Sequence, residues 1–173
     1  MDRLLARVWR PDVTSARTHL TLRVRTGSES WLSDVGFGSS PAGPLSLDAE
    51  DPQQVGAWTY EVVPGDLPST WALRELQAGE WVTQYTVEEA SVYPIDVVLS
   101  NYYTSTHPES WFTQVPIVVC REPEAIRSLL GRTYTITRPG HVKERRELSD
   151  AEWKDALQQE FGLTDTELVK NFP

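Results

Sequence analysis

Alternating apolar and polar residues dominate the first half of the sequence and predict antiparallel strands. Residues 17–25 and 31–36 alternate or run apolar, are rich in β-branched and aromatic residues, and flank a loop that contains Gly27, a pattern typical of a hairpin. Further strand patterns, each closed by Gly, Pro or Asp, cover residues 58–63, 70–76 and 81–87,. Together these segments predict a meander or a small barrel.

Two stretches of this half lack the alternation. The first eight residues are predicted to form a helical turn or the end of a helix, which Pro11 would stop,. Residues 38–56 are rich in Pro, Gly and Ser, so they are predicted to form a long surface loop, and loops of this length in compact domains are often functional.

The second half of the sequence mixes helix and strand patterns. Residues 94–106 place a proline at a plausible first helical position and apolar residues at positions 95, 98, 99 and 102, which predicts a helix. Strand patterns follow over residues 113–121, 132–138 and 141–148, with a Pro139–Gly140 turn joining the last two,.

The C-terminal residues are predicted to be helical. Ser149 and Glu152 have the spacing of a capping box, and Thr164 and Glu167 repeat it,. The fold class that we expect is therefore α+β: an antiparallel barrel-like domain over residues 1–92, then an interdomain helix and an α/β lid with C-terminal helices over residues 93–173.

Composition narrows the function classes. Of the 173 residues 39% are hydrophobic and 24% charged, which is a globular balance,. The net charge is -9, and the basic residues are scattered apart from a KERRE run at 143–147 that carries its own glutamates, so nucleic acid is an unsuitable partner. The charges at positions 2, 3 and 7 do not suit a signal peptide, and no apolar run approaches the roughly 20 residues that cross a bilayer,.

The cysteine and histidine content excludes further kinds of site. The single cysteine, Cys120, excludes an internal disulfide framework and a four-thiolate zinc site, and it suits a reducing cytoplasm,. The three histidines have no spacing typical of a metal site, so we expect no metal.

The predicted hairpin carries two polar residues, His19 and Asp34, that are poorly suited to a sheet. Opposite residues in an antiparallel pair have numbers of constant sum, so His19 and Asp34 share a face when that sum is odd, which a loop of even length supplies. A two-residue turn at Thr26–Gly27 would place them directly opposite, and a four-residue loop would place them on a diagonal. The other face, which we expect to be the core face, would then hold a second set of residues: Leu20, Leu22, Val24, Trp31, Ser33 and Val35.

Such a pair has a chemical use. Asp34 would accept a hydrogen bond from one imidazole nitrogen of His19 and leave the other free to take a proton from a nucleophile. Other roles remain open. His19 would be a structural histidine of the sheet with its hydrogen bonds satisfied, and Asp34 would cap the VGFG turn. Gly36 and Gly38 would most simply permit positive φ in that turn,.

The hairpin segments "THLTLRV" and "WLSDVGFG", followed by "NYYTSTHPESWF" at 101–112 and "ERRELSDAE" at 144–152, resemble the arylamine N-acetyltransferase family in that order. The resemblance runs from about residue 5 to the end of the chain. It implies a cysteine-proteinase-like acyltransferase fold and a Cys-His-Asp triad. It also implies ping-pong transfer of an acetyl group from acetyl-CoA to an arylamine, an arylhydroxylamine or a hydrazine.

The resemblance also assigns roles to residues. His19 is the general base and Asp34 its orienter. The loop of Gly36, Phe37 and Gly38 approaches the acetyl group and the acceptor, with Phe37 as an aromatic wall. Thr104, Ser105, Thr106 and Phe112 resemble a segment near the substrate cleft, whereas His107 is expected to be a cap or a surface residue.

One element of the family is missing from the sequence. The family's nucleophilic cysteine lies in an Arg-Gly-Gly-x-Cys-like segment of an N-terminal helical domain, and this sequence has no such segment. Cys120 lies instead in an apolar strand pattern, where a buried, inert thiol is usual. We therefore expect an N-terminally truncated family member that is inactive alone.

Two alternatives remain. The chain would be a pseudoenzyme that binds CoA or an arylamine, or half of a split enzyme that associates with itself or with a separate N-terminal half through an exposed apolar surface. Otherwise it would be an unrelated small ligand-binding β-barrel, in which His19 and Asp34 point apart.

Overall fold

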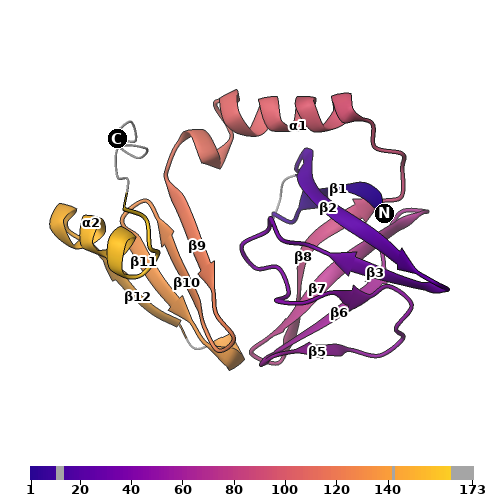
Figure 1. Ribbon diagram of the computed structural model, residues 1–173, viewed down its shortest axis with the longest axis horizontal. Helices are drawn as coiled ribbons and strands as arrows, with labels where there is room; N and C mark the ends of the chain where they lie inside the picture. Colours follow the sequence, from indigo (N-terminus) through magenta and orange to yellow (C-terminus); the bar gives the residue numbers. More distant parts are fainter. Residues whose placement is uncertain (11–13, 142, 165–173) are drawn as a thin grey trace. The chain divides into compact units, whose positions relative to one another are not determined.

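The computed structural model describes residues 1–10, 14–141 and 143–164. The chain divides into two compact units, Met1–Tyr103 and Thr104–Pro173 (Figure 1). The sequence predicted a division earlier, between residues 92 and 93. The helix α1 (Pro94–Thr106) lies mostly with the first unit, where the Ser100 hydroxyl donates to the carbonyl of Arg17 at 2.9 Å.

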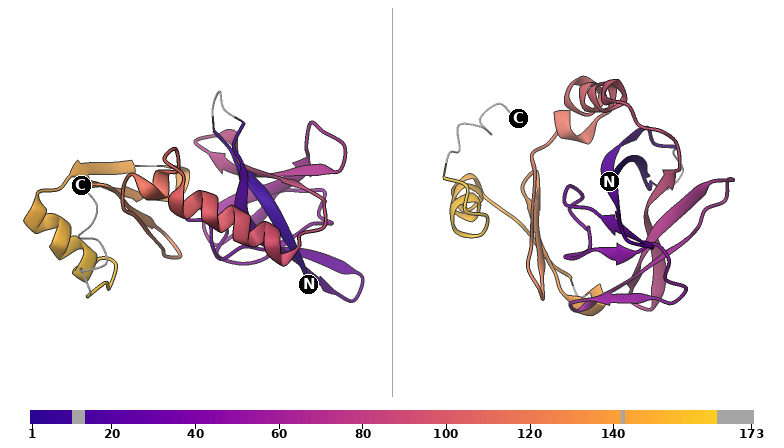
Figure 2. Two further views of the ribbon diagram at one scale, coloured as in Figure 1. Left: turned by 90° about the horizontal axis from the view of Figure 1, so that it is seen from above. Right: turned by 45° about the vertical axis from the view of Figure 1, so that its right-hand side comes forward.

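Eight strands form an antiparallel sheet in the first unit, in the order β4-β3-β2-β1-β8-β7-β6-β5. Their bounds are β1 Asp2–Val8, β2 Arg17–Thr26, β3 Glu29–Ser33, β4 Leu45–Ser46, β5 Gln53–Val55, β6 Trp58–Pro64, β7 Thr70–Gln77 and β8 Glu80–Glu88. The sheet curves strongly about its interior (Figure 2). The predicted antiparallel barrel-like sheet is therefore confirmed.

A side chain links the two edge strands of this sheet. The Gln53 amide of β5 accepts from the backbone N–H of Ser46 at 2.7 Å and donates to the Ser46 carbonyl at 2.9 Å. Because a side-chain amide offers the same donor and acceptor as a peptide unit, it continues the ladder from β4 to β5, and the sheet is nearly closed.

Two sequence predictions for this unit were wrong. Residues 2–8 form β1 rather than a helical turn. Leu4, Leu5 and Ala6 are all buried, and three consecutive buried residues show neither the period of a half-buried strand nor that of a helix. The predicted loop over residues 38–56 contains β4 and β5, which are too short to give a periodic signal.

The predicted core face of the hairpin is also inverted. Thr21, Leu32 and Asp34 are at most 8% exposed, whereas Leu20 is 37% and Val35 96% exposed. The face that carries His19 and Asp34 is therefore the inner face of the sheet. Its buried neighbours from the other strands include large apolar residues: Leu4, Tyr60, Leu73, Tyr85 and Val87.

Helix α1 exposes its apolar residues. The backbone N–H of Tyr93 donates to Asp96 at 2.7 Å near its start. None of its 13 residues, all of them described, is buried, and the predicted apolar positions are well exposed: Ile95, Val98, Leu99 and Tyr102.

The second unit is a four-stranded antiparallel sheet with one helix packed on it. The strand order is β12-β11-β10-β9. In chain order the elements are η1 Trp111–Thr113, β9 Ile117–Arg121, β10 Ile126–Leu130, β11 Thr133–Thr137, η2 Pro139–His141, β12 Lys143–Glu147 and α2 Asp150–Gln159. Its core consists of Leu129, Tyr134, Leu148, Ala156 and Leu157.

The start of α2 confirms the first predicted capping box. The Ser149 hydroxyl accepts from the backbone of Glu152, and the Glu152 side chain accepts from the backbone of Ser149, which satisfies two amides at the helix N-terminus. The second predicted box, Thr164 and Glu167, ends outside the described residues. With two antiparallel sheets and few helices, the α+β class is confirmed.

Candidate active site

The hairpin of β2 and β3 places His19 and Asp34 on one face. Thr26 pairs with Glu29 and Leu22 with Ser33, so the two-residue turn is Gly27–Ser28, one residue later than predicted. The numbers of opposite residues still add up to an odd value, as predicted. Continued by one step, this register sets Asp34 beside Thr21 and leaves His19 on the diagonal, still within reach. Gly27 takes a φ of 62°, which glycine adopts without strain.

The two side chains make a short hydrogen bond. His19 Nε2 lies 2.6 Å from Asp34 Oδ2, and the imidazole is 10% and the carboxyl 0% exposed. A carboxylate only accepts, so Nε2 carries the proton and Nδ1 keeps its lone pair. No described residue makes a hydrogen bond to Nδ1.

Asp34 is held as an anion. Burial alone would raise its pKa, but the hydrogen bond and the charge of His19 and the backbone N–H of Gly36 outweigh burial and lower the pKa from 3.8 to about 2,. At neutral pH the carboxylate therefore remains ionised, and it favours a positive charge on the imidazole when His19 accepts a proton.

The second carboxylate oxygen organises the loop that follows. Asp34 Oδ1 accepts from the backbone N–H groups of Gly36 at 3.0 Å and Phe37 at 3.2 Å, so Asp34 does cap the turn, as one reading of the sequence proposed. A methyl group on Gly36 would lie 3.8 Å from Cε1 of His19. The expectation of positive φ was wrong, because neither Gly36 nor Gly38 has it. Gly36 leaves open space beside the imidazole instead.

Two aromatic rings flank the imidazole. The ring centroids of Phe37 and Tyr85 lie 5.3 and 5.2 Å from that of His19 and 5.5 Å from each other, edge to face. Tyr85 is fully buried, and burial, followed by the charge of Asp34, raises its pKa well above 10, so its hydroxyl stays neutral. Such packing fixes the imidazole orientation.

A buried carboxylate–imidazole pair with one free ring nitrogen has the arrangement that the base and its orienting carboxylate take in an acyl-transfer triad. An N-acetyltransferase family model matches residues 1–168. The chain belongs to the arylamine N-acetyltransferase family. The family prediction made from the sequence is therefore confirmed.

Curated relatives and solved structures agree with the family assignment. The chain is 30% identical over 160 residues to an arylamine N-acetyltransferase / N-hydroxyarylamine O-acetyltransferase of Salmonella typhimurium, covering 90% of this chain and 56% of that protein. It resembles the Mycobacterium abscessus arylamine N-acetyltransferase structure with a TM-score of 0.88 at 30% identity, covering 94% of this chain and 60% of that one.

A further structure of the family contains CoA. The chain resembles the Mycobacterium marinum arylamine N-acetyltransferase in complex with CoA with a TM-score of 0.86 at 30% identity, covering 96% of this chain and 64% of that one. The chain thus spans little more than half the length of the family members that it matches.

The remaining predicted substrate residues belong to the second unit. Phe112, in η1, is 60% exposed, and the carbonyl of Thr104 accepts from the hydroxyl of Ser110 at 2.6 Å. His107 Nδ1 accepts from the backbone N–H of Glu109 at 3.2 Å, which is a capping contact. The substrate roles of Thr104 and Phe112 stay predictions.

Cys120 also lies in the second unit. It is partly buried on the edge strand β9, opposite Arg127 of β10. Among the residues that the structure describes, no three His, Cys, Asp or Glu side chains form a group that could hold a metal ion. No helix within the described residues is long and apolar enough to cross a membrane.

Tyr85 is the residue of this site that the sequence did not indicate. It lies on β8, and β1 separates β8 from the hairpin. The only sequence signal was an aromatic residue in a strand pattern, which does not specify the strand order that brings it to His19.

Proposed function

We propose that this chain supplies the general base and its orienting carboxylate for acetyl transfer from acetyl-CoA to the amino group of an arylamine, an arylhydroxylamine or a hydrazine. The observation that carries the proposal is the buried 2.6 Å contact between His19 Nε2 and Asp34 Oδ2. Membership of the arylamine N-acetyltransferase family supports the reaction class, and the CoA-bound Mycobacterium marinum structure supports the donor.

The chemistry divides into two half-reactions. In the first, a cysteine thiol gives its proton to His19 Nδ1, and the thiolate attacks the acetyl carbonyl and displaces CoA, which leaves as its thiol after taking a proton. In the second, the amine attacks the acetyl thioester, loses a proton to His19 and releases the cysteine. Asp34 remains ionised throughout because its pKa is about 2, and it stabilises the imidazolium in both halves.

The loop after Asp34 would serve the substrate. Gly36 leaves space beside Cε1 of the imidazole, and the Phe37 ring packs beside the imidazole at a tilt. We propose that the acyl group and the aromatic acceptor meet there, with Phe37 as one wall and Gly38 in the same loop. We also propose Thr104 and Phe112 as substrate contacts, on the basis of the family resemblance of their segment.

The nucleophile would come from a polypeptide segment other than the one printed here. The only cysteine of this sequence is Cys120, which lies on a strand of the second unit and not in the family's Arg-Gly-Gly-x-Cys context. The chain also spans only 56% of the Salmonella typhimurium protein. We therefore expect the isolated chain to turn over slowly at best, because loss of a triad nucleophile costs on the order of 10⁶ in a hydrolytic triad.

The test is complementation. The chain is mixed with radiolabelled acetyl-CoA and 4-methoxyaniline, with and without a purified helical segment of the family that carries Arg-Gly-Gly-x-Cys, hereafter the complementing segment. Turnover is expected only with the complementing segment, and equally for wild type and Cys120→Ser. Fast turnover by the isolated chain that Cys120→Ser abolishes would contradict the proposed source of the nucleophile. Failure of His19→Ala to reduce complemented turnover would contradict the role of the base.

A binding role without turnover is the second candidate. The observation that favours it is the intact imidazole and aromatic wall in a chain whose lone cysteine lies elsewhere. Calorimetric titration of the isolated chain with CoA distinguishes the two, since a pseudoenzyme binds CoA and gains no turnover from the complementing segment.

A further inference from the structure

The backbone pairing between β1 and β8 covers only part of β1. On one side β1 pairs with β2 from Asp2 to Arg7. On the other side it pairs with β8 over only three residues, Ala6 to Val8, with Ala6 opposite Val87. Continued in the same register, the ladder would set Leu4 opposite Glu89 and Met1 opposite Val92.

Strand β8 instead stays with β7. Thr70 pairs with Glu88, and the backbone N–H of Glu89 donates to the carbonyl of Ser69 at 2.9 Å. The chain therefore follows β7 beyond Val87 and leaves the edge of β1 over residues 2–5 without a partner strand among the described residues.

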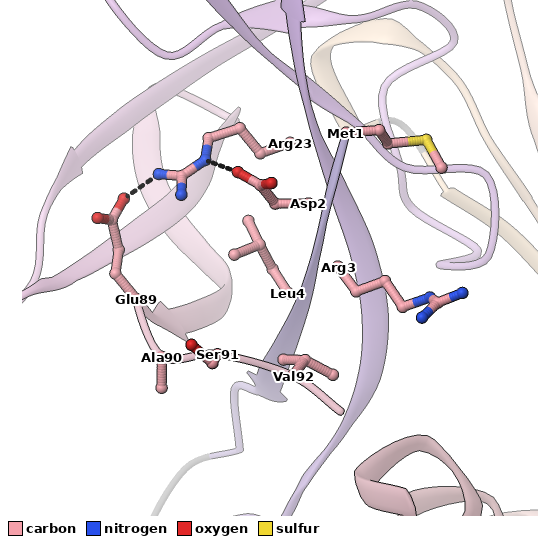
Figure 3. A pocket seen from close by; sticks show the side chains of 9 residues that line it. All are labelled: Met1, Asp2, Arg3, Leu4, Arg23, Glu89, Ala90, Ser91 and Val92. Carbon is pink, nitrogen blue, oxygen red and sulfur yellow. Dashed lines mark hydrogen bonds and ion pairs between the residues drawn. The ribbon is translucent and has the colours of Figure 1, made fainter. Parts of the chain in front are cut away.

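The space between the separated segments is a hollow of about 600 Å³ (Figure 3). It is lined by Met1, Asp2, Arg3 and Leu4 on one side and by Glu89, Ala90, Ser91 and Val92 on the other, with Arg23 from β2. These two four-residue segments are the ones that the continued ladder would pair. The hollow, hereafter the seam, is thus a strand-sized gap bordered by backbone on both sides.

A side chain bridges the seam where backbone bonds would otherwise do so. Arg23 Nε donates to Asp2 Oδ2 at 3.2 Å and its Nη1 donates to Glu89 Oε1 at 2.9 Å. Figure 3 shows the guanidinium between the two carboxylates, on the side of β1 that also carries Leu4. These contacts hold the segment after β8 through side chains and leave the backbone edges available.

The two faces of β1 specify the chemistry of an added strand. Leu4 is 2% exposed, whereas Arg3 projects on the other side of the strand (Figure 3), is exposed and makes no ion pair with the described residues. Because opposite residues of neighbouring strands share a face, an added strand would need an acidic residue opposite Arg3 and apolar residues on the side of Leu4.

A second copy of β1 does not meet this requirement. A two-fold axis through the seam pairs residues whose numbers have an even sum, so it sets Arg3 against Arg3 or Asp2 against Asp2, and like charges directly opposite destabilise a sheet. A register centred on Leu4 would need the edge at Ala6, which β8 occupies.

We propose that the seam binds an extended segment of another polypeptide, about four residues long, in which apolar residues alternate with an acidic one. The segment adds a strand to β1, with main-chain hydrogen bonds giving affinity and the Arg3 contact giving selectivity. This site is separate from the acyl-transfer residues, because it lies at the opposite end of β2 from His19.

The test uses three synthetic peptides and the ¹⁵N-labelled chain. The probes are acetyl-Thr-Val-Glu-Val-Thr-amide, its Glu→Lys counterpart, and a counterpart N-methylated at the Glu amide. Because the backbone N–H of Trp9 donates to Gln84 of β8, Arg3 also turns its backbone to this edge, and the residue opposite Arg3 is the one that donates to β1. The Glu peptide is expected to shift the amide signals of residues 2–5 and 88–92. The Lys peptide is expected to bind roughly three- to fivefold more weakly, the size of an exposed ion pair, and the N-methylated peptide not at all.

Arg3→Glu is the decisive variant, since Arg3 is exposed and its replacement leaves the core intact. It is expected to reverse the preference, so that the Lys peptide binds more tightly than the Glu peptide. Arg145→Glu, an equal charge change on β12 of the second unit, is the matched control and is expected to leave the preference unchanged. Equal binding of the Glu and Lys peptides to the wild-type chain, or signal shifts outside the seam, would overturn the proposal.

A tethered version keeps the test decisive where the free peptides bind weakly. Thr-Val-Glu-Val-Thr-Asn-Gly is fused ahead of Met1, so that Asn-Gly forms a two-residue hairpin turn, Glu lies opposite Arg3, and the effective peptide concentration is in the millimolar range. Slower amide exchange at residues 2–5 in the Glu fusion than in the Lys fusion is the expected result. Equal exchange in the two fusions would contradict the proposal.

Discussion

The inner face of β2 carries a side chain paired with a carboxylate near each end, and the two pairs are built differently. At one end His19 meets Asp34 with side chains that are 10% and 0% exposed. At the other end Arg23 meets Asp2 and Glu89, whose side chains are 38% and 42% exposed. The strand, the face and a carboxylate partner are common to both, so the surroundings account for the difference.

The surroundings decide what each pair can do. Asp34 has two backbone donors on its second oxygen and two aromatic rings beside its partner, so the pair is held in one geometry and is largely shielded from water. Arg23 shares its guanidinium between two half-exposed carboxylates, where water and salt compete. The first pair is suited to holding a proton at a defined atom, and the second to holding two segments at a distance.

Breaking the buried pair has the largest expected effect. Asp34→Asn keeps the shape but replaces an obligatory acceptor by a group that can also donate, so the His19 proton is no longer confined to Nε2. Complemented acetyl transfer is expected to fall by about 10⁴, the scale seen when the same change is made in a hydrolytic triad, as measured in single-turnover assays with the complementing segment.

The isolated chain provides a second readout of this change. Two-dimensional ¹⁵N spectra of the imidazole report which nitrogen carries the proton, and Asp34→Asn is expected to shift it from Nε2 toward Nδ1. Asp48→Asn is the matched control, because Asp48 is an exposed aspartate that accepts from the backbone of Ser30. The same tautomer in wild type and Asp34→Asn would show that the carboxylate does not set it.

Removing the Tyr85 ring that packs beside His19 has the second largest expected effect. Tyr85 is fully buried among the residues of the inner face, so Tyr85→Ala is expected to lower the free energy of unfolding by about 3–5 kcal/mol, measured by urea denaturation followed through tryptophan fluorescence. Tyr85→Phe keeps the ring and is expected to cost under about 1.5 kcal/mol. Tyr93→Ala, at a site 64% exposed, is the control. Equal losses for Tyr85→Ala and Tyr85→Phe would assign the effect to the hydroxyl.

The sequence predicted the chemistry of this site better than its packing. The odd sum that brings His19 and Asp34 to one face followed from the even loop length alone. The choice of inner face did not, because Leu20, Leu22 and Val24 are more apolar than Thr21 and Arg23, yet the sheet buries the face that carries the latter. Polar residues paired across the interior satisfy one another, and hydropathy does not register that pairing.

The order of the strands and the presence of the short strands could not be predicted from the sequence, for a different reason. Tyr85 reaches His19 only because β1 inserts between β2 and β8, and no local pattern encodes which strands are neighbours. Strands β4 and β5 pair over only two and three residues, with β3 and β6 respectively, and such short pairings leave no periodic pattern in a segment whose composition is that of a loop. Strand β10 was missed as well, because its five residues follow a run of Glu and Pro.

Protonating Asp34 is expected to have a smaller effect on stability. Because the pKa of Asp34 is lowered in the folded protein, stability is lost as the pH falls. The folded-state pKa of Asp34 is about 2 against 3.8 ordinarily, so its contribution to stability is complete above pH 4 and is lost as the pH falls toward 2. The loss is about 2 kcal/mol, at about 1.4 kcal/mol for each pKa unit.

The measurement compares urea denaturation of wild type and Asp34→Asn between pH 5 and pH 2, in roughly half-unit steps. The difference between the two proteins is expected to shrink across this window. Glu152, whose pKa is lowered by the hydroxyl and then the backbone N–H of Ser149, titrates alike in both and cancels. A difference that stays constant with pH would contradict the ionised, paired state of Asp34.

Breaking the exposed pair has the smallest expected effect. Arg23→Met keeps the apolar stem and removes the guanidinium, and because Asp2 and Glu89 are over a third exposed, the loss is expected to be about 1 kcal/mol or less. The loss should shrink further at high salt, whereas that of Asp34→Asn should not. The His19 tautomer is expected to be unchanged in Arg23→Met. A loss as large and as insensitive to salt as that of Asp34→Asn would mean that the two ends of β2 are not built differently after all, since exposure would then have no bearing on what an ion pair contributes.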